Sequence, residues 1–265
     1  MNENGFPIAL SIAGSDSGGG AGIQADLKTF HRFGVFGTSA ITAITAQNTL
    51  GVHAIHAVPV EDVRAQIDAL ATDLRPHALK TGMLATAELT REVAKAIRAH
   101  GLERYVMDPV MVATSGDRLL EVEAEKALRD DLLPLATVVT PNLEEAAILT
   151  GRAVRSVDDM LVAAQAIVEL GAAAALVKGG HLDGDAVDVL WDGSSAHRFQ
   201  RRRIDTRHTH GTGCTLSAAI AAGLARGHDL HEAIERATRY VGRAIAEAPG
   251  LGSGHGPLNH FVSID

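Results

Sequence analysis

Short, wholly apolar runs alternate with amphipathic stretches along most of the chain, and this alternation constrains the fold more than any other feature. The expected strands are Ile8–Ala13, Ser39–Ala46, Ala78–Thr81, Tyr105–Met107, Thr137–Thr140 and Ala174–Lys178. Several are apolar throughout, as strands covered on both faces are. The expected helices between them are Gly22–Phe33, Glu61–Leu74, Glu88–His100, Glu121–Leu133, Asn142–Thr150 and Val157–Leu170. This order predicts an α/β fold with a mostly parallel central sheet and helices on both faces.

The last third of the chain has a different pattern. Ala186–Trp191 and His197–Ile204 are expected to form a hairpin that turns at Asp192–Gly193–Ser194. Two helices, at about Gly213–Arg226 and Leu230–Ala248, follow the hairpin. Because no repeat and no linker rich in Pro, Gly or Ser interrupts the sequence, we expect a single domain over residues 1–265.

Composition excludes several classes of function. Lys and Arg number 24 against 32 Asp and Glu, and the resulting net charge of −8 disfavours nucleic acid as a partner. A single cysteine, Cys214, excludes a disulfide framework and a multi-cysteine metal site. No apolar run approaches the ~20 residues of a membrane-spanning helix, and the N-terminus lacks the basic region of a signal peptide. We therefore expect a cytoplasmic protein with no membrane partner.

A first glycine cluster, Gly14–Gly22, lies between the first expected strand and the first helix. Five glycines in nine residues favour close approach of the backbone to a ligand, although a tight turn explains them as well. Gly20-x-Gly22-x-x-Ala25 also matches a loose dinucleotide fingerprint. That fingerprint needs an acidic residue about 20 residues on, and the second strand ends instead in Gln47-Asn48.

A second cluster, His210–Thr215, directly precedes the expected helix near the C-terminus. Small residues there expose the first N–H groups of the helix, which lack internal partners and carry partial positive charge. That arrangement favours a phosphate or a developing anion. The alternative is an ordinary glycine-rich cap with a buried Cys214.

Polar residues follow three other expected strands. Asn142 and Glu145, three apart, could hold magnesium-bound water beside phosphates, or they could form a capping box. Lys178 could reach a phosphate as a point charge, or extend from the sheet edge into water. Asp108 follows its strand in the same way. The histidine pairs have no carboxylate in zinc-protease spacing, so we interpret them as surface or capping residues.

Taken in order, these segments resemble the hydroxymethylpyrimidine/phosphomethylpyrimidine kinases of thiamine biosynthesis, in the vitamin kinase branch of the ribokinase-like superfamily. The segments that carry the resemblance are Ala13–Asp16, Gly18–Lys28, Ile44–Thr49, Lys80–Leu84, Asp108–Met111, Thr140–Glu145, Lys178–His181 and Thr209–Leu216. The resemblance implies a three-layer α/β/α sandwich and ATP- and Mg²⁺-dependent phosphorylation of a hydroxymethylpyrimidine and then of its monophosphate. A homodimer is implied as well.

The resemblance also assigns roles to residues. The residues that would line the pyrimidine pocket are Gly14, Asp26, Gln47, Met83 and Val110. Asp108 and Glu145 would organise magnesium. The residues that would contact ATP are Asn142, Lys178, Thr209, Gly211, Thr212 and Gly213, and Gly211, Gly213 and Cys214 would form an anion hole.

Elementary chemistry agrees with two of these roles. The Gln47 amide offers the donor and acceptor that an aminopyrimidine edge requires. Cys214 stands where many sugar kinases of the superfamily have an aspartate base, and a helix N-terminus is expected to lower the pKa of its thiol. We therefore expect Cys214 to act as an assisting base or proton relay, because a loose phosphoryl-transfer transition state needs little early deprotonation.

Three other functions compete. Pyridoxal/pyridoxine kinases share most of the motifs, although Gln47-Asn48 favours a pyrimidine. A nucleotide-cofactor oxidoreductase is weakened by the missing acidic residue. A binding protein without catalysis is disfavoured by the presence of Lys178, Glu145 and Cys214 together. The kinase interpretation requires these groups to meet in one crevice.

Overall fold

The computed structural model describes residues 5–111, 122–180 and 184–264. Within them, one sheet runs in the order β3-β2-β1-β4-β5-β6-β7-β8-β9. The strands are β1 Ile8–Asp16, β2 Phe36–Asn48, β3 Gly51–Ala57, β4 Ala78–Thr81, β5 Tyr105–Met107, β6 Val138–Val139, β7 Ala175–Lys178, β8 Ala186–Trp191 and β9 Ala196–Arg201. Neighbouring strands from β2 to β7 pair in parallel, and β3, β8 and β9 add antiparallel edges.

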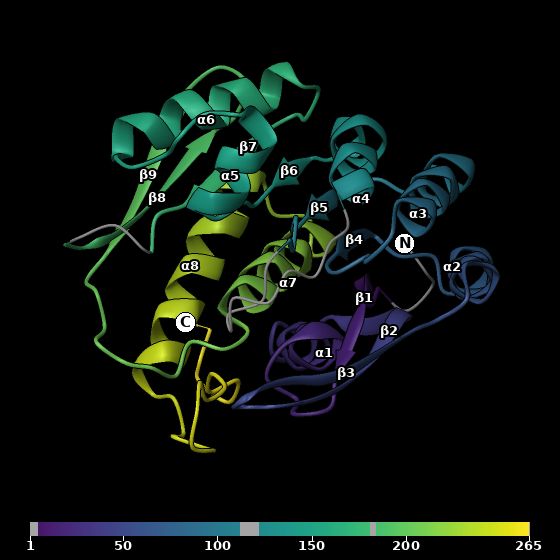
Figure 1. Ribbon diagram of the computed structural model, residues 1–265, viewed down its shortest axis with the longest axis horizontal. Helices are drawn as coiled ribbons and strands as arrows, with labels where there is room; N and C mark the ends of the chain where they lie inside the picture. The colour runs from purple at the N-terminus through teal and green to yellow at the C-terminus, as the bar shows by residue number, and fades with distance from the viewer. Residues whose placement is uncertain (1–4, 112–121, 181–183, 265) are drawn as a thin grey trace.

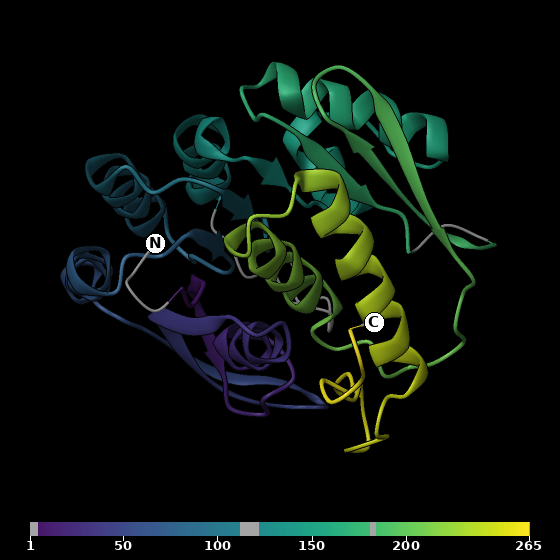
Figure 2. The ribbon, with the colours of Figure 1, turned by 180° about the vertical axis from the view of Figure 1, so that it is seen from behind.

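Helices cover both faces of this sheet (Figures 1 and 2). One layer consists of α1 Gly22–Arg32, α7 Thr212–Ala225 and α8 Leu230–Ala246. The other consists of α2 Val60–Asp73, α3 Ala87–His100, α4 Val122–Ala127, α5 Leu143–Thr150 and α6 Val157–Glu169. Each layer buries its own cluster of apolar side chains against the sheet. The prediction of an α/β fold with a mostly parallel sheet is confirmed.

Several elements differ from the prediction, and three of the differences have a clear physical reason. Strand β3 was not expected, because it is an edge strand with exposed side chains over most of its length and therefore lacks an apolar run. The helix predicted from Glu121 begins outside the described residues, and after α4 the chain passes through a π-turn and a 3₁₀ turn that contains Pro134. Strand β1 continues past Gly14 to Asp16 through a register shift between Ala13 and Ser15.

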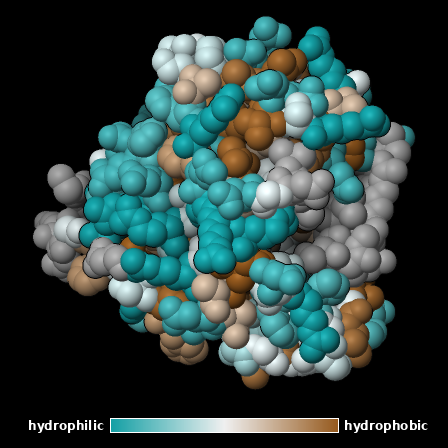
Figure 3. Space-filling view, turned by 90° about the vertical axis from the view of Figure 1, so that its left-hand side faces the viewer, coloured by the Kyte–Doolittle hydropathy of each residue, from teal (hydrophilic) through white to brown (hydrophobic). Residues whose placement is uncertain are grey.

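The fold brings the carboxyl ends of the parallel strands to one edge of the sheet, where α/β proteins bind ligands. Helix α7 starts at the same edge and lies in the core, with every residue from Thr215 to Ala225 buried. No helix among the described residues is long and apolar enough to cross a membrane. The side of the molecule that lies on the left in Figure 1 is mainly hydrophilic, with a group of apolar residues near the upper middle of the view (Figure 3).

Candidate active site

The two glycine clusters meet as two loops in direct backbone contact. Gly211 has a φ of +82°, and a Cβ atom added there would lie 1.8 Å from the carbonyl oxygen of Gly20. Both facts require glycine at this position. The segment after α8 packs beside both loops, since the His210 amide donates to the Gly256 oxygen at 3.2 Å and a Cβ atom added at Gly20 would lie 3.1 Å from Pro257 Cβ. The same segment contacts the turn after β2, where the His255 amide donates to the Thr49 oxygen at 2.8 Å.

Asp16 organises the first loop. Its carboxylate accepts hydrogen bonds of 2.8 to 3.0 Å from the amides of Gly18, Gly20 and Ala21. His210, from the second loop, lies 2.9 Å away through its Nε2. Burial raises the pKa of Asp16, but the hydrogen bonds from His210 and the backbone outweigh it, so the net pKa is lowered. Asp16 is therefore a fixed negative charge that joins the two loops.

The N-terminus of α7 offers two free amides. Thr212 donates its N–H to the Thr209 oxygen at 3.2 Å, and Thr215 donates to the Gly211 oxygen at 2.8 Å. Among the described residues, neither the Gly213 nor the Cys214 amide has an acceptor, and Gly211 provides no side-chain cap. Two such donors at the positive end of a helix form the anion-binding geometry that the sequence predicts.

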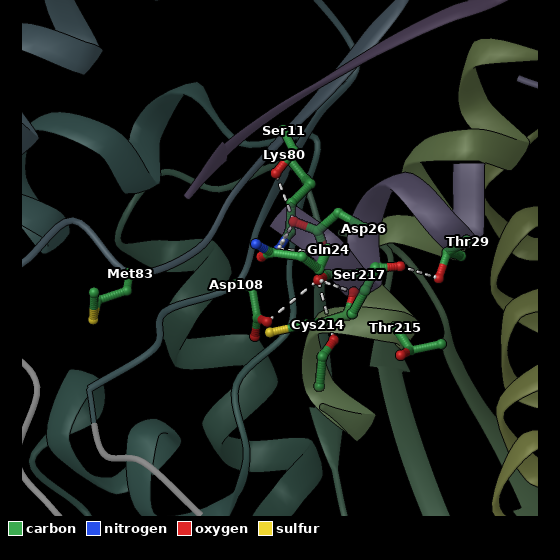
Figure 4. A network of polar contacts seen from close by, with 12 residues as sticks. Ser11, Gln24, Asp26, Thr29, Lys80, Met83, Asp108, Cys214, Thr215 and Ser217 are labelled. Carbon is green, nitrogen blue, oxygen red and sulfur yellow. Dashed lines mark hydrogen bonds and ion pairs between the residues drawn. The ribbon is translucent and has the colours of Figure 1, made fainter. Parts of the chain in front are cut away.

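Charged groups from three different strand ends meet beside these amides. Lys178 Nζ lies 3.2 Å from Asp108 Oδ1 and 4.0 Å from Glu145 Oε2. A Cβ atom at Gly213 would be 3.2 Å from the same Nζ, so the lysine tip lies directly against the start of α7. Ser217 donates to Asp108 Oδ2 at 3.2 Å (Figure 4). The structure thus brings together the cation, both acids and the amides before Cys214, as the kinase interpretation requires.

Asn142 and Glu145 form a capping box, which was one of the two interpretations of their spacing. The Asn142 amide donates to Glu145 Oε2 at 2.8 Å, and the Glu145 amide donates to Asn142 Oδ1 at 2.9 Å. The Met111 amide also donates to the Glu145 carboxylate. The capping box therefore holds Glu145 at the site, because its Oε2 remains near Lys178 while it caps the helix. The backbone of Asn142 also pairs with that of Lys178 in a parallel bridge.

Burial controls the ionisation of this cluster. Desolvation, helped by the negative charge of Asp108, raises the pKa of Glu145 despite the opposing charge of Lys178. Desolvation disfavours the Lys178 ammonium, but Asp108 and Glu145 together outweigh it and raise the pKa of Lys178. The lysine therefore stays charged at neutral pH, and a cation or phosphate that enters would change the balance among the three groups.

The residues fit a magnesium ion shared with phosphates. Asp108 and Glu145 are both buried carboxylates that face one lysine. Within the described part of the chain, no group of three or more His, Cys, Asp or Glu side chains is placed to hold a metal. Magnesium that accompanies a nucleotide needs only one or two carboxylates, because phosphates and water complete its shell.

The thiol of Cys214 does not have the lowered pKa that the sequence led us to expect. Burial, with the charges of Asp26 and Asp108, raises its pKa to about 11, although Lys80 and the amide of Gly22 oppose the shift. The prediction considered only the N-terminus of α7 and left out the loss of solvent and the two nearby carboxylates, which raise the pKa of the thiol. At neutral pH, Cys214 is therefore a thiol and not a thiolate.

The predicted pyrimidine pocket is only partly open to solvent. Met83 and Val110 are half-buried, and a Cβ atom at Gly14 would lie 2.8 Å from the Met83 methyl carbon. In Figure 4, Met83 stands apart from the charged network around Asp108. Gln47 is half-buried at the end of β2, where its side chain contacts Thr45 and His210.

Asp26 differs from its predicted place. It is fully buried, accepts a hydrogen bond of 2.5 Å from Ser11 Oγ, and pairs with Lys80 Nζ at 3.1 Å. Both of its oxygens are thus occupied inside the protein, where Asp26 lies beside Ser11 and Lys80 (Figure 4). Asp26 therefore has no exposed oxygen with which to line the pocket.

Sequence reasoning did not single out Lys80, His210 and Ser217 as site residues. Lys80 gives a signal, because a lysine inside an otherwise apolar strand must be paired when it is buried. His210 and Ser217 give none, since their partners Asp16 and Asp108 are distant in sequence. His181, at the end of one predicted motif, lies outside the described residues.

One protein family matches most of the chain. The model of the phosphomethylpyrimidine kinase family matches residues 16–259. The chain belongs to this family. Among its relatives, the hydroxymethylpyrimidine/phosphomethylpyrimidine kinase of Rhizobium meliloti (strain 1021) is 57% identical over 96% of this chain and 97% of its own. The corresponding kinase of Bacillus subtilis (strain 168) is 52% identical over 96% of this chain and 94% of its own.

Solved structures of phosphomethylpyrimidine and pyridoxal kinases share the fold. An ADP complex of Bacillus subtilis pyridoxal kinase has a TM-score of 0.91 at 44% identity and covers 96% of this chain and 97% of its own. A phosphomethylpyrimidine kinase from Clostridium difficile 630 has a TM-score of 0.80 at 42% identity and covers 91% and 98%. The family, the kinase activity and the fold predicted from the sequence are confirmed, and membership of a kinase family implies the use of ATP.

Proposed function

We propose that this phosphomethylpyrimidine kinase family member transfers a phosphoryl group from ATP to the hydroxymethyl group of 4-amino-5-hydroxymethyl-2-methylpyrimidine, and then to the resulting monophosphate. The observation that carries the proposal is the meeting of Lys178, Asp108 and Glu145 beside the two free amides before α7. Phosphoryl transfer needs positioning and neutralisation of charge on the transferred oxygens. This cluster provides both.

Each group has a role in the proposal. Lys178 and the amides of Gly213 and Cys214 would stabilise the oxygens of the transferred group, with Gly211 shaping the loop. Asn142, Thr209 and Thr212 would contact the nucleotide. Magnesium, when bound, would neutralise phosphate charge, and Asp108 and Glu145 would hold it.

The acceptor would bind on the other side of Cys214. Gln47 would read the aminopyrimidine edge, and Gly14, Met83 and Val110 would contact the ring. Cys214 would relay the hydroxymethyl proton as the new bond forms. We further propose a homodimer that works in the cytoplasm without a nucleic acid partner.

An ADP-release assay tests this function. The purified protein is given ATP and Mg²⁺ with hydroxymethylpyrimidine, its monophosphate or pyridoxal, and each reaction is repeated with EDTA. We expect turnover of both pyrimidines that EDTA abolishes, and none with the variant Lys178→Met, which controls for contaminating kinases. Turnover of pyridoxal alone would instead assign pyridoxal as the substrate. This is the main alternative, because solved pyridoxal kinases have similar structures. No ADP release with any acceptor would overturn the proposal.

A further inference from the structure

The Gln47 amide lies between two polar partners from different elements. Its Oε1 lies 3.2 Å from Thr45 Oγ1, and its Nε2 lies 3.4 Å from His210 Nε2. The two ends of a primary amide have nearly the same shape, so the hydrogens of their partners decide which end carries the oxygen. Both partners have a neighbour that fixes where their hydrogen points.

At the His210 end, that neighbour is Asp16. His210 Nε2 lies 2.9 Å from Asp16 Oδ2, while the same carboxylate already accepts three backbone amides. A carboxylate that accepts so many donors is ionised and can only accept. His210 Nε2 must therefore carry its hydrogen and donate it to Asp16. An amide NH₂ facing that N–H would place donor against donor, whereas the amide oxygen at the longer distance of 3.4 Å would share the same hydrogen with the Asp16 carboxylate.

At the Thr45 end, the neighbour is the carbonyl of Ser15. Thr45 Oγ1 lies 3.0 Å from the Ser15 oxygen, which can only accept. The hydroxyl has one hydrogen, and the carbonyl takes it, so the lone pairs of Thr45 Oγ1 remain for a donor. Thr45 is buried, so water does not compete for them. The amide NH₂ is the group that fits this end.

We propose that Thr45 and His210 are positioning residues that hold the Gln47 amide with its oxygen toward His210 and its NH₂ toward Thr45. This inference rests on the proposed function, in which Gln47 reads the substrate ring. Each end of the amide keeps one free position, a lone pair and an N–H, which lie side by side. The held orientation fixes on which side of the amide the lone pair lies and on which side the N–H lies. It therefore favours a ring with an amino donor beside a ring nitrogen. A pyridine ring that lacks the amino group gains nothing from this order.

The kinetic test compares Thr45→Val with the matched control Thr45→Ser, each alone and combined with Gln47→Ala. We expect Thr45→Val to raise the KM for hydroxymethylpyrimidine about tenfold with kcat changed less than about twofold. Thr45→Ser retains the hydroxyl and should restore the KM. In the Gln47→Ala background, Thr45→Val should have no further effect, because it acts through Gln47. Equal effects in both backgrounds, or a KM in Thr45→Ser as high as in Thr45→Val, would overturn the inference.

A second measurement does not depend on activity. The side-chain NH₂ of Gln47 gives an NMR signal that is assigned by its loss in Gln47→Ala. Without substrate, Thr45→Val should shift this signal and speed its hydrogen exchange, and Thr45→Ser should leave it in place. An NH₂ signal unchanged in Thr45→Val would overturn the inference even if the enzyme turns over pyrimidines. Normal NMR behaviour with no pyrimidine turnover would instead overturn the proposed function alone.

Discussion

At the scale of single residues, the chemistry of the site depends on how burial opposes charge. Cys214 lies at a helix N-terminus, yet its pKa is raised to about 11 by burial with the charges of Asp26 and Asp108. Glu145 is a carboxylate with a raised pKa for the same reason. Both groups therefore hold protons more strongly than in water, which makes their effects dependent on pH.

Cys214 is expected to give kcat a characteristic pH dependence. If its thiolate takes the substrate proton, kcat should rise with pH between about 7 and 9, since the thiolate fraction grows with pH below the raised pKa. We expect Cys214→Ala to lower kcat by about 10²-fold, to flatten the profile and to leave the KM nearly unchanged. Steady-state kinetics across this range measures both effects. Wild-type turnover in Cys214→Ala would remove the cysteine from the chemistry.

Glu145 is expected to make stability fall as pH rises. Because its folded-state pKa is raised from 4.5 to about 7, its stabilising contribution is full below pH 4.5 and is lost as pH rises through about 7. Glu145→Gln cannot ionise and should gain stability relative to the wild type between pH 5 and pH 8, by up to about 3 kcal/mol. Urea unfolding at both pH values measures this.

The same variant should lose activity, because the carboxylate proposed to hold magnesium is gone. Asp159→Asn provides a control, since Asp159 is an N-terminal carboxylate on α6 whose pKa is lowered by the Arg155 amide and Ser156. Its stability relative to the wild type should not improve toward pH 8. A gain in Glu145→Gln that is equal at pH 5 and pH 8 would contradict the expectation.

At the scale of elements, one glycine precedes α7 and another follows it. The two glycines have nearly the same backbone conformation, but their surroundings differ. Gly211 precedes the helix at φ +82° against the backbone of Gly20, and Gly227 follows it at φ +88° with nothing within 4 Å of an added Cβ. Alanine at Gly227 should cost only the strain of positive φ, about 1–2 kcal/mol. Alanine at Gly211 should cost at least about 2 kcal/mol more, because a close-packed contact must open.

Urea unfolding of Gly211→Ala and Gly227→Ala measures this difference directly. Activity should also fall in Gly211→Ala, since its loop carries the free amides of the site, and should be retained in Gly227→Ala. Equal losses of stability in the two variants would show that the contact between the loops contributes nothing beyond backbone strain.

The elements also show what could be predicted from sequence. Strands β4 and β5 were predicted to the residue, because an apolar run buried on both faces has a clear signal. The first glycine loop, Lys178 and Glu145 lie at the expected edge because each follows a strand of the parallel sheet. The second loop lies there because it precedes α7, which starts at the same edge. Edge strand β3 could not be predicted because its side chains are mostly exposed and give no apolar run, although it pairs with the adjacent β2. The burial of Asp26 could not be predicted because its partner Lys80 is far away in sequence.

At the scale of the whole molecule, one continuous sheet contains strands from Ile8 to Arg201, and α7 and α8 pack against it in one apolar cluster. We therefore expect one cooperative unfolding transition, in accord with the single domain that the sequence predicts. The single tryptophan, Trp191, lies on β8 near one edge of the sheet, so its emission reports on that region, while far-UV circular dichroism reports on all elements. The two probes should give the same urea midpoint. Separate midpoints would reveal two independent units.

The packing of the segment after α8 against the two loops has a consequence for how the enzyme is made. His210 binds Gly256, and Thr49 binds His255, so contacts at the catalytic edge join residues near the start of the chain to residues near position 255. A nascent chain still emerging from the ribosome lacks these last contacts even when its sheet has formed. Catalytic competence should therefore arise only after the segment around Gly256 has left the ribosome and is free to fold.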